Sequence, residues 1–408
     1  MNDGMQSQGS SVGTDPAVPL LVITPSVPAS MIGPDYFLDD KAISGLARYA
    51  AFWPGELRVI FRSGEPTDIA FGRILDPADL PFELAIVPGN TAIPTELFSD
   101  ASIVLASGDN HNDFPLAPSC RALAVPLIFV VEHIVETRLK MVALGNQPPV
   151  SRLKSAVWTL MAELRRRRAF AAASGLQANG TPAGRAYASL TSDMLVFFDT
   201  RMTRKMMATD DEIARKAAYL SSGRPLRLGF SGRLEPLKGA SHLVDVAERL
   251  RALNTPFSLD IFGKGTLEPV IRQRIEATGL QDCVSLHAPL DFETELVPRF
   301  KDSIDLFVCC HRQADPSCTY LETFGCGVPI IAYRNKAFDG LLALTDAGWT
   351  TPAGNPAKMA AAIAALDKDR AAIIGAVKKA RALAFDNDFD TTFKKRTDQL
   401  IRIWQARA

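Results

Sequence analysis

Two successive sets of short apolar runs constrain most strongly what this 408-residue chain can fold into. The first set covers residues 19–26, 57–63, 82–89, 102–108, 126–133 and 193–200, and the second covers 226–232, 257–263, 283–290, 305–311, 328–333 and 348–352. Continuous runs of Val, Ile, Leu and Phe of this length are typical of parallel strands buried on both faces. Segments with helical spacing lie between them, at 39–53, 151–173, 242–253 and 267–279. The sequence therefore predicts an α/β fold with two Rossmann-like parallel-sheet domains in tandem, facing across a cleft.

The runs also suggest where the domains begin and end. We expect a flexible tail at 1–16, a first domain at 17–200, a charged linker at 201–223 and a second domain at 224–385. The last segment, 386–408, is charged, contains a tryptophan and has helical spacing. We expect this segment to pack back on the first domain.

Composition excludes several classes of protein. Forty-five Lys and Arg balance 45 Asp and Glu, which argues against a dedicated nucleic-acid binder and predicts no nucleic-acid partner. Six cysteines without paired C-x-x-C spacing fit neither a disulfide scaffold nor a zinc site. No apolar run is long enough for a membrane span, and the polar N-terminus lacks the features of a secretory signal. We therefore expect a cytoplasmic protein with reduced thiols.

The loop that opens the second domain is suited to bind an anion. Residues 232–239 read Gly-Arg-Leu-Glu-Pro-Leu-Lys-Gly and lie between a predicted strand and a predicted helix. Such a junction presents free backbone N–H groups and a positive helix end. Arg233 adds a planar fork for phosphate oxygens, and Lys238 adds a point charge. Gly232 permits a close approach of the backbone to a ligand. The alternative is a surface turn with two solvated cations.

A second polar segment lies between the strands predicted at 305–311 and 328–333. We expect Asp315 to cap a helix with Pro316 at its first position. The free N–H groups near Ser317, Cys318 and Thr319 would then point over the sheet. Glu322 could accept hydrogen bonds from a ribose diol, although a solvated helix residue is the alternative.

Further polar candidates follow strands of the first domain. Asp109 and His111 are candidates for acid–base chemistry, with an Asx-type turn as the alternative. Arg165–Arg168 form a run of four arginines on a predicted helix. These arginines are either a solvated helix end or a peripheral contact with anionic lipid head groups.

Taken in order, the motifs of residues 225–365 resemble those of glycosyltransferase family 4, the retaining nucleotide-sugar enzymes with the GT-B fold. The matching pieces are G-R-L-x-x-x-K-G at 232–239, F-G-x-G at 262–265, V-x-L-x-x-x-L at 284–290 and L-E-T-x-x-C-G-V-P-I-I-A-Y at 321–333. The first domain matches only loosely.

This resemblance implies a role for several residues of the second domain, which would bind the donor. Arg233 and Lys238 would hold the donor diphosphate, Glu322 the ribose, and the backbone of His287–Leu290 the base. The first glutamate of the family's pair would fall at Ala314, and the nearest carboxylate is that of Asp315.

The first domain would bind the acceptor, and Asp109 and His111 are candidates for contacting it. The family often has a histidine at a strand end near the reacting carbon, a role that falls to His133 here. The loop after the first strand, with Gly33 and Lys41, would face the same cleft.

The function implied is transfer of a hexose-type sugar from a UDP- or GDP-sugar to an acceptor hydroxyl with retention. The acceptor would be a saccharide or a lipid-linked molecule in bacterial polysaccharide or glycolipid assembly, which allows a peripheral position on the inner membrane face. No acidic pair is placed to chelate a metal across a diphosphate, so we expect metal independence and no cofactor. Two alternatives remain: a nucleotide-sugar epimerase on the same fold, or a non-catalytic scaffold that binds a nucleotide sugar.

Overall fold

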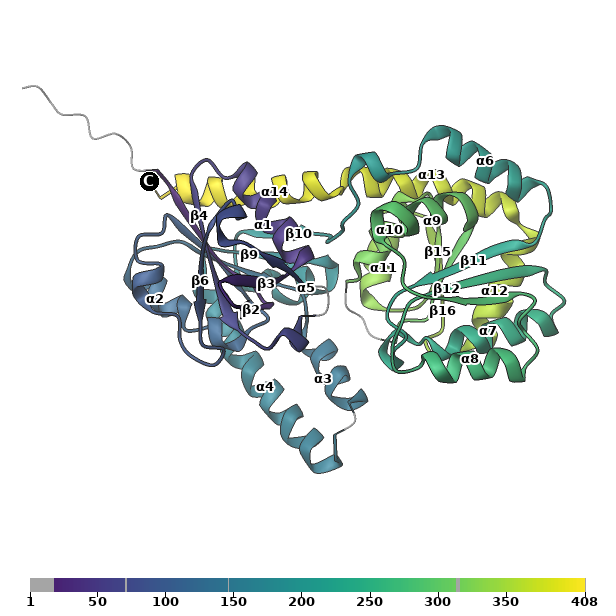
Figure 1. The fold of residues 1–408 in the computed structure, drawn as a ribbon, viewed down its shortest axis with the longest axis horizontal. Coiled ribbons are helices and arrows are strands. Elements are labelled where there is room, and N and C mark those ends of the chain that lie inside the picture. Colours follow the sequence, from purple (N-terminus) through teal and green to yellow (C-terminus); the bar gives the residue numbers. More distant parts are fainter. Residues whose placement is uncertain (1–17, 70–71, 146, 313–315, 408) are drawn as a thin grey trace, which may run out of the picture.

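The computed structural model describes residues 18–69, 72–145, 147–312 and 316–407. Two α/β domains lie side by side, each around its own sheet, and two long C-terminal helices run along both (Figure 1). The tail expected at 1–16 and the cap expected at Asp315 lie outside the described residues.

The first domain is built on a ten-stranded sheet. Its strands are β1 (Leu20–Thr24), β2 (Pro28–Ile32), β3 (Asp35–Asp39), β4 (Glu56–Ser63), β5 (Gly72–Leu75), β6 (Glu83–Val87), β7 (Ile103–Ser107), β8 (Leu127–Val131), β9 (Gly175–Asn179) and β10 (Met194–Phe197). The main part is parallel, in the order β10-β9-β8-β7-β1-β4-β6, while β2, β3 and β5 form a ribbon with antiparallel pairing. All residues of β1, β7 and β9 are buried, as expected for strands covered on both faces.

The second domain holds a six-stranded sheet that is parallel throughout. Its strands are β11 (Leu226–Ser231), β12 (Phe257–Phe262), β13 (Val284–His287), β14 (Leu306–Cys309), β15 (Ile330–Tyr333) and β16 (Gly348–Thr351). The order is β13-β12-β11-β14-β15-β16, which is that of a Rossmann sheet. The order reverses between β11 and β14, and in such sheets ligands bind at the carboxyl ends of the strands at this point.

Helices cover both sheets. Those of the first domain are α1 (Asp40–Phe52), α2 (Leu116–Ala122), α3 (Val135–Leu144), α4 (Pro149–Ala172) and α5 (Gly180–Tyr187). The following helices are α6 (Asp210–Ser221), α7 (Ser241–Ala252), α8 (Glu268–Ala277), α9 (Val297–Ser303), α10 (Cys318–Gly325), α11 (Lys336–Leu342), α12 (Pro356–Lys368), α13 (Arg370–Asp386) and α14 (Phe389–Gln405).

The last helix completes the core of the first domain. Phe389, Phe393, Leu400 and Ile403 of α14 are buried together with residues of β1, β4 and α1. Helix α13 packs instead on α6 and α10, so the chain leaves the second domain and returns to the first between α13 and α14 (Figure 1).

The fold predicted from the sequence is confirmed, and each of the twelve apolar runs contains a strand. The sequence analysis missed four strands of the first domain, β2, β3, β5 and β9. The segment after β1 is a β-hairpin and not an open loop, because Gly33 adopts a positive φ of 64° and allows a tight turn between β2 and β3. Strand β9 was missed because its buried Gln177 and Asn179 interrupt the apolar pattern.

Candidate functional site

The loop after β11 lies against the end of β14, where the order of the second sheet reverses. Gly239 ends this loop with a φ of +62°, and a Cβ atom there would lie 2.0 Å from the carbonyl oxygen of Cys310. No side chain fits at this distance. The glycine therefore allows the end of this loop to pack against the backbone that follows β14, which fixes the course of residues 232–239.

We predict that Gly239→Ala destabilises the protein by about 1–3 kcal/mol, because alanine meets both a strained backbone and the carbonyl of Cys310. Denaturant unfolding measures this loss. Gly375→Ala is the matched control, since a Cβ atom at this position in α13 meets nothing within 4 Å. The control should change the stability by at most about 1 kcal/mol, in the stabilising direction. Equal effects of the two substitutions would contradict this account of the loop.

The two cations of this loop are available to a ligand. Arg233 is exposed and Lys238 is half-buried. Neither side chain donates a hydrogen bond to, or forms an ion pair with, another residue in the part of the chain that the structure describes. The imidazole of His311, which follows β14, is buried close to Lys238, and both burial and that cation lower its pKa. His311 thus places a neutral imidazole beside the cationic loop. The sequence analysis assigned no role to this residue.

The first turn of helix α10 lies at the boundary between the two domains. Its N-cap residue is Ser317, and the helix begins at Cys318. The expectation that Pro316 opens the helix was therefore wrong. Pro316 lies before the cap instead and packs on Gly180 of the first domain, where an added Cβ would come within 2.9 Å of the proline. The backbone N–H groups of Cys318 and Thr319 belong to the first turn of α10, where helical N–H groups have no partner within the helix.

Glu322 is held by an arginine from the segment between the domains. Arg201 donates from Nε to Oε1 at 2.8 Å and from Nη2 to Oε2 at 3.3 Å. The guanidinium also lies 3.8 Å from the centre of the Phe292 ring, which follows Leu290 in the segment expected near the base. Glu322 is only 8% exposed. It is thus a buried, paired carboxylate and not the solvated helix residue of the alternative interpretation.

A second polar cluster joins the two domains. The Lys41 ammonium on α1 donates to Oδ2 of Asp199 at 2.5 Å and to Sγ of Cys318 at 2.9 Å. Cys318 Sγ lies 3.4 Å from the same carboxylate oxygen. Lys41, expected on the acceptor side, therefore contacts a residue expected on the donor side.

The cluster stays charged around neutral pH. Burial alone would lower the pKa of Lys41, but the neighbouring Asp199 carboxylate raises it above its ordinary value. Burial would likewise raise the pKa of Asp199, but Lys41 lowers it. Burial raises the pKa of Cys318, so this cysteine remains a thiol. The contact between the domains is therefore an ammonium–carboxylate pair with a neutral thiol beside it.

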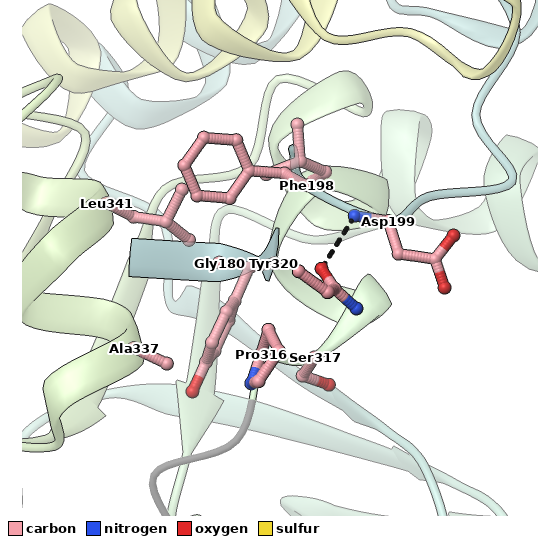
Figure 2. Close-up of a pocket in the computed structure, with 10 residues that line it drawn as sticks. Gly180, Phe198, Asp199, Pro316, Ser317, Tyr320, Ala337 and Leu341 are labelled. Atoms are coloured by element: carbon pink, nitrogen blue, oxygen red, sulfur yellow. Dashed lines mark hydrogen bonds between the residues drawn. The ribbon is translucent and has the colours of Figure 1, made fainter. Parts of the chain in front are cut away.

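A small pocket lies next to this cluster, between the domains (Figure 2). Asn179, Gly180, Phe198 and Asp199 line it from the first domain, and Pro316, Ser317, Tyr320, Leu321, Ala337 and Leu341 line it from the second. The Asp199 carboxylate points away from Leu341 and Ala337, while its backbone N–H donates to Asn179 Oδ1 at 3.2 Å (Figure 2). The pocket thus shows that the first turn of α10 faces the ends of β9 and β10.

On the first domain, Asp109 orders the strand end that carries His133. Its carboxylate accepts from the backbone N–H of Glu132 at 2.7 Å and of His133 at 3.2 Å, and from Arg138 Nη2 at 2.7 Å. Arg166 Nη1 donates to the carbonyl of His133 at 2.7 Å. Asp109 and His133 therefore lie together, with the histidine ring partly exposed.

The four-arginine run is not uniformly solvated. Arg166 is 1% exposed and also bonds Tyr187, while Arg165 and Arg168 are exposed. The alternative of a solvated helix end does not hold for Arg166, because this side chain is buried against His133 and Tyr187.

His111 packs against helix α4. Its ring contacts Trp158 of α4 edge-on at 5.0 Å between ring centres. Burial lowers its pKa, with a further contribution from nearby arginines, including Arg62. His111 therefore presents a neutral imidazole at the surface.

The structure brings the predicted residues together in three groups: Arg233 and Lys238 on the loop after β11, Lys41 with Cys318, and Asp109 with His133. Gly232 begins the loop after β11, and Leu290 lies in the loop after β13. Asp199 and Arg201 were missed by the sequence analysis. The only signal for them was the polar sequence Asp-Thr-Arg directly after the apolar run that ends the first domain.

Within the described residues, no group of three or more His, Cys, Asp or Glu side chains is arranged to hold a metal ion. None of the helices described in the structure has both the length and the apolar content needed to cross a membrane. The six cysteines form no disulfide.

Comparison with known proteins bears on the second domain most directly. Residues 211–383 match the family of group 1 glycosyl transferases. The chain is 28% identical over 119 residues to the GtfA subunit of the UDP-N-acetylglucosamine–peptide N-acetylglucosaminyltransferase of Streptococcus gordonii, with 28% of this chain and 22% of that protein covered. It is 31% identical over 120 residues to D-inositol 3-phosphate glycosyltransferase of Arthrobacter sp. (strain FB24), with 27% of this chain and 28% of that protein covered. The matches thus span less than a third of these relatives.

Likeness of fold extends over both domains. HepE of Anabaena, in a crystal structure with UDP and glucose, is similar with a TM-score of 0.61 at 14% identity, with 94% of this chain and 99% of that chain covered. Residues 211–383 therefore form a group 1 glycosyl transferase domain, and the chain as a whole has the GT-B fold.

Proposed function

We propose that this protein transfers a sugar from a nucleotide diphosphate sugar to an acceptor hydroxyl, with retention of the anomeric configuration. The acceptor is a saccharide or a lipid-linked molecule. A UDP-sugar is the first donor to test, because the similar fold of HepE holds UDP and the matched relative from S. gordonii is named for UDP-N-acetylglucosamine. A GDP-sugar is the second.

The observation that carries the proposal is the cationic loop at the point where the second sheet reverses its order. Arg233 and Lys238 extend from a loop whose backbone is fixed by Gly239, at the edge where ligands of such sheets bind. Negative charge develops on the diphosphate as it leaves. Cations that are already in place stabilise this charge without reorganisation.

The paired carboxylate of Glu322 suits the nucleoside part of the donor. A carboxylate has about four acceptor positions, and Arg201 occupies two of them, so a ribose diol can use the others. The bidentate arginine also fixes the orientation of the carboxylate before the ligand arrives. Arg201 is therefore proposed as a positioning residue for Glu322.

We predict that Glu322→Gln weakens binding of the nucleoside diphosphate by about tenfold to a hundredfold, because the acceptor strength of the carboxylate is lost. Arg201→Met should weaken binding less, by about threefold to tenfold, since the carboxylate remains but is no longer oriented. Calorimetric titration of both variants checks this order. Tighter binding to Arg201→Met than to wild type would show instead that Arg201 competes with the ligand for Glu322.

On the acceptor side, we propose that His133 lies near the reacting carbon. Asp109 accepts from the backbone N–H of His133, and Arg166 donates to its carbonyl oxygen. Neither residue forms a hydrogen bond with the imidazole nitrogens. Both nitrogens lie 3.9 Å from the nearest carboxylate oxygen. The ring is thus positioned but remains able to hydrogen-bond a sugar hydroxyl.

The test is a transfer assay with UDP- and GDP-sugars against a panel of saccharide and lipid-linked acceptors. Product formation with the same anomeric configuration as the donor, read by proton NMR, is the expected result. Turnover of the donor sugar without any acceptor would support the epimerase alternative. Tight binding of a nucleotide sugar without turnover on any acceptor would support the scaffold alternative.

A further inference from the structure

Helices α3 and α4 project from the first domain as a hairpin, away from both sheets (Figure 1). The C-terminal half of α4 is anchored: Ala162, Glu163, Arg166, Ala169 and Phe170 are buried on one side of it. Helix α3 also packs on α4, so only the part of α4 turned away from the domain and from α3 is free to carry other side chains.

The side of α4 opposite the anchored one bears a stripe of large apolar residues. Its members are Val150, Leu153, Val157, Leu160, Met161 and Leu164, between 50% and 68% exposed. Steps of three and four residues place them along one face of an α-helix. Trp158, 48% exposed, lies at the edge of this face. Soluble monomers rarely leave a contiguous apolar surface of this kind uncovered, so the stripe marks a docking surface.

The charges around the stripe identify the kind of partner. Lys154, Arg165 and Arg168 are exposed on the same side of α4. The single acidic residue of the helix, Glu163, is buried and paired with Arg166 and Tyr187. The docking surface therefore combines apolar side chains with positive charge and offers no exposed carboxylate from α4.

We propose that the stripe of α4 docks on an anionic lipid bilayer, with the helix lying in the plane of the interface. An apolar face flanked by Lys and Arg is what interfacial helices use: the apolar residues enter the acyl boundary and the cations contact the head groups. The proposal does not depend on the transferase function, because it rests on α4 alone.

A second copy of the chain is the competing occupant. Val150, Leu153, Val157, Leu160 and Leu164 follow the spacing of a two-stranded coiled coil. In such a pair, however, the positions that flank the seam would bring Lys154 and Arg168 to the interface without a carboxylate of α4 to pair with them. Charge complementarity thus favours the anionic bilayer.

The experiment is flotation of the full chain with vesicles of phosphatidylcholine alone and of phosphatidylcholine with 30% phosphatidylglycerol. We expect binding to the anionic vesicles, weaker binding to the neutral ones, and loss of binding as salt is raised. Leu153→Glu/Leu160→Glu/Leu164→Glu should lower the bound fraction at least about tenfold. Three apolar contacts are lost, and the anionic vesicle surface repels the carboxylates that replace them. Lys154→Glu/Arg165→Glu/Arg168→Glu should abolish the preference for anionic vesicles.

The matched control places glutamate at apolar residues of similar exposure on the second domain, Leu253→Glu/Val270→Glu/Leu344→Glu, and should bind as wild type does. Circular dichroism confirms that each variant is folded. Absence of wild-type binding to anionic vesicles would overturn the proposal. So would a dimer in light scattering that the stripe variant converts to a monomer, since a second copy would then cover the stripe. Binding and transfer are measured separately, so failure of one proposal leaves the other intact.

Discussion

Arg233→Ala/Lys238→Ala is expected to lower kcat/KM for sugar transfer by about a thousandfold or more. Each cation removed from a preorganised anion site costs roughly a factor of ten to a thousand in rate, because charge on the leaving diphosphate is left uncompensated. The side chains are unpaired with the other described residues, so their loss should leave the fold intact. Unfolding transitions of wild type and variant should therefore coincide.

The control is Arg249→Ala/Lys358→Ala, which removes two exposed cations from the same domain. It changes the net charge equally and should leave kcat/KM within about twofold of wild type, since surface charges far from the site act only through screened long-range fields. An equal loss of activity in both double variants would assign the effect to net charge and contradict the local role of the loop.

Arg62→Met is expected to destabilise the protein by about 3–5 kcal/mol, since it leaves a buried carboxylate without its cation. Asp113 is fully buried and accepts from Arg62 Nη2 at 2.6 Å and from Thr24 Oγ1 at 2.7 Å. Arg62 also donates to the carbonyls of Thr91 and Asn112. The pair thus holds the ends of β1, β4 and β7, where the order of the first sheet reverses.

Burial also raises the pKa of Asp113, although Arg62 and Thr24 act in the opposite direction. Without Arg62, the pKa of Asp113 in the folded variant should rise further above that of an aspartic acid in the unfolded chain. The folded state then binds this proton more tightly than the unfolded chain does. The free energy of unfolding of the variant should therefore fall as the pH rises above the ordinary range of an aspartic acid. Adding Asp113→Asn should restore part of the loss, because no buried charge remains. Chemical denaturation of the single and double variants between pH 5 and pH 8 measures both effects. A single variant as stable as wild type would contradict the account of this pair.

The fold was predictable from the sequence because parallel strands buried on both faces leave continuous apolar runs. Strands such as β7 and β15 are buried at every residue and stood out accordingly. The hairpin of β2 and β3 gave no such signal, since Met31 and Ile32 are exposed and its alternation is short. Helix α13 was likewise not singled out, because its alanine-rich sequence lacks a strong apolar stripe.

The site was predictable where a loop follows a strand of the second sheet, as for Arg233 and Lys238. It was not predictable where residues distant in sequence meet across the domain boundary. Lys41 contacts Asp199 and Cys318, which are 158 and 277 residues away. No spacing in the sequence encodes such a contact, because it depends on how the two sheets are placed by α13 and α14.

The measurement that tests the central claim most directly is calorimetric titration of UDP and GDP into wild type and into Arg233→Ala/Lys238→Ala. The account predicts that one nucleoside diphosphate binds wild type in the micromolar range and binds the double variant at least about a hundredfold more weakly. Equal affinity for both proteins, or no binding to wild type at millimolar concentration, would contradict the assignment of the loop after β11 as the donor diphosphate site.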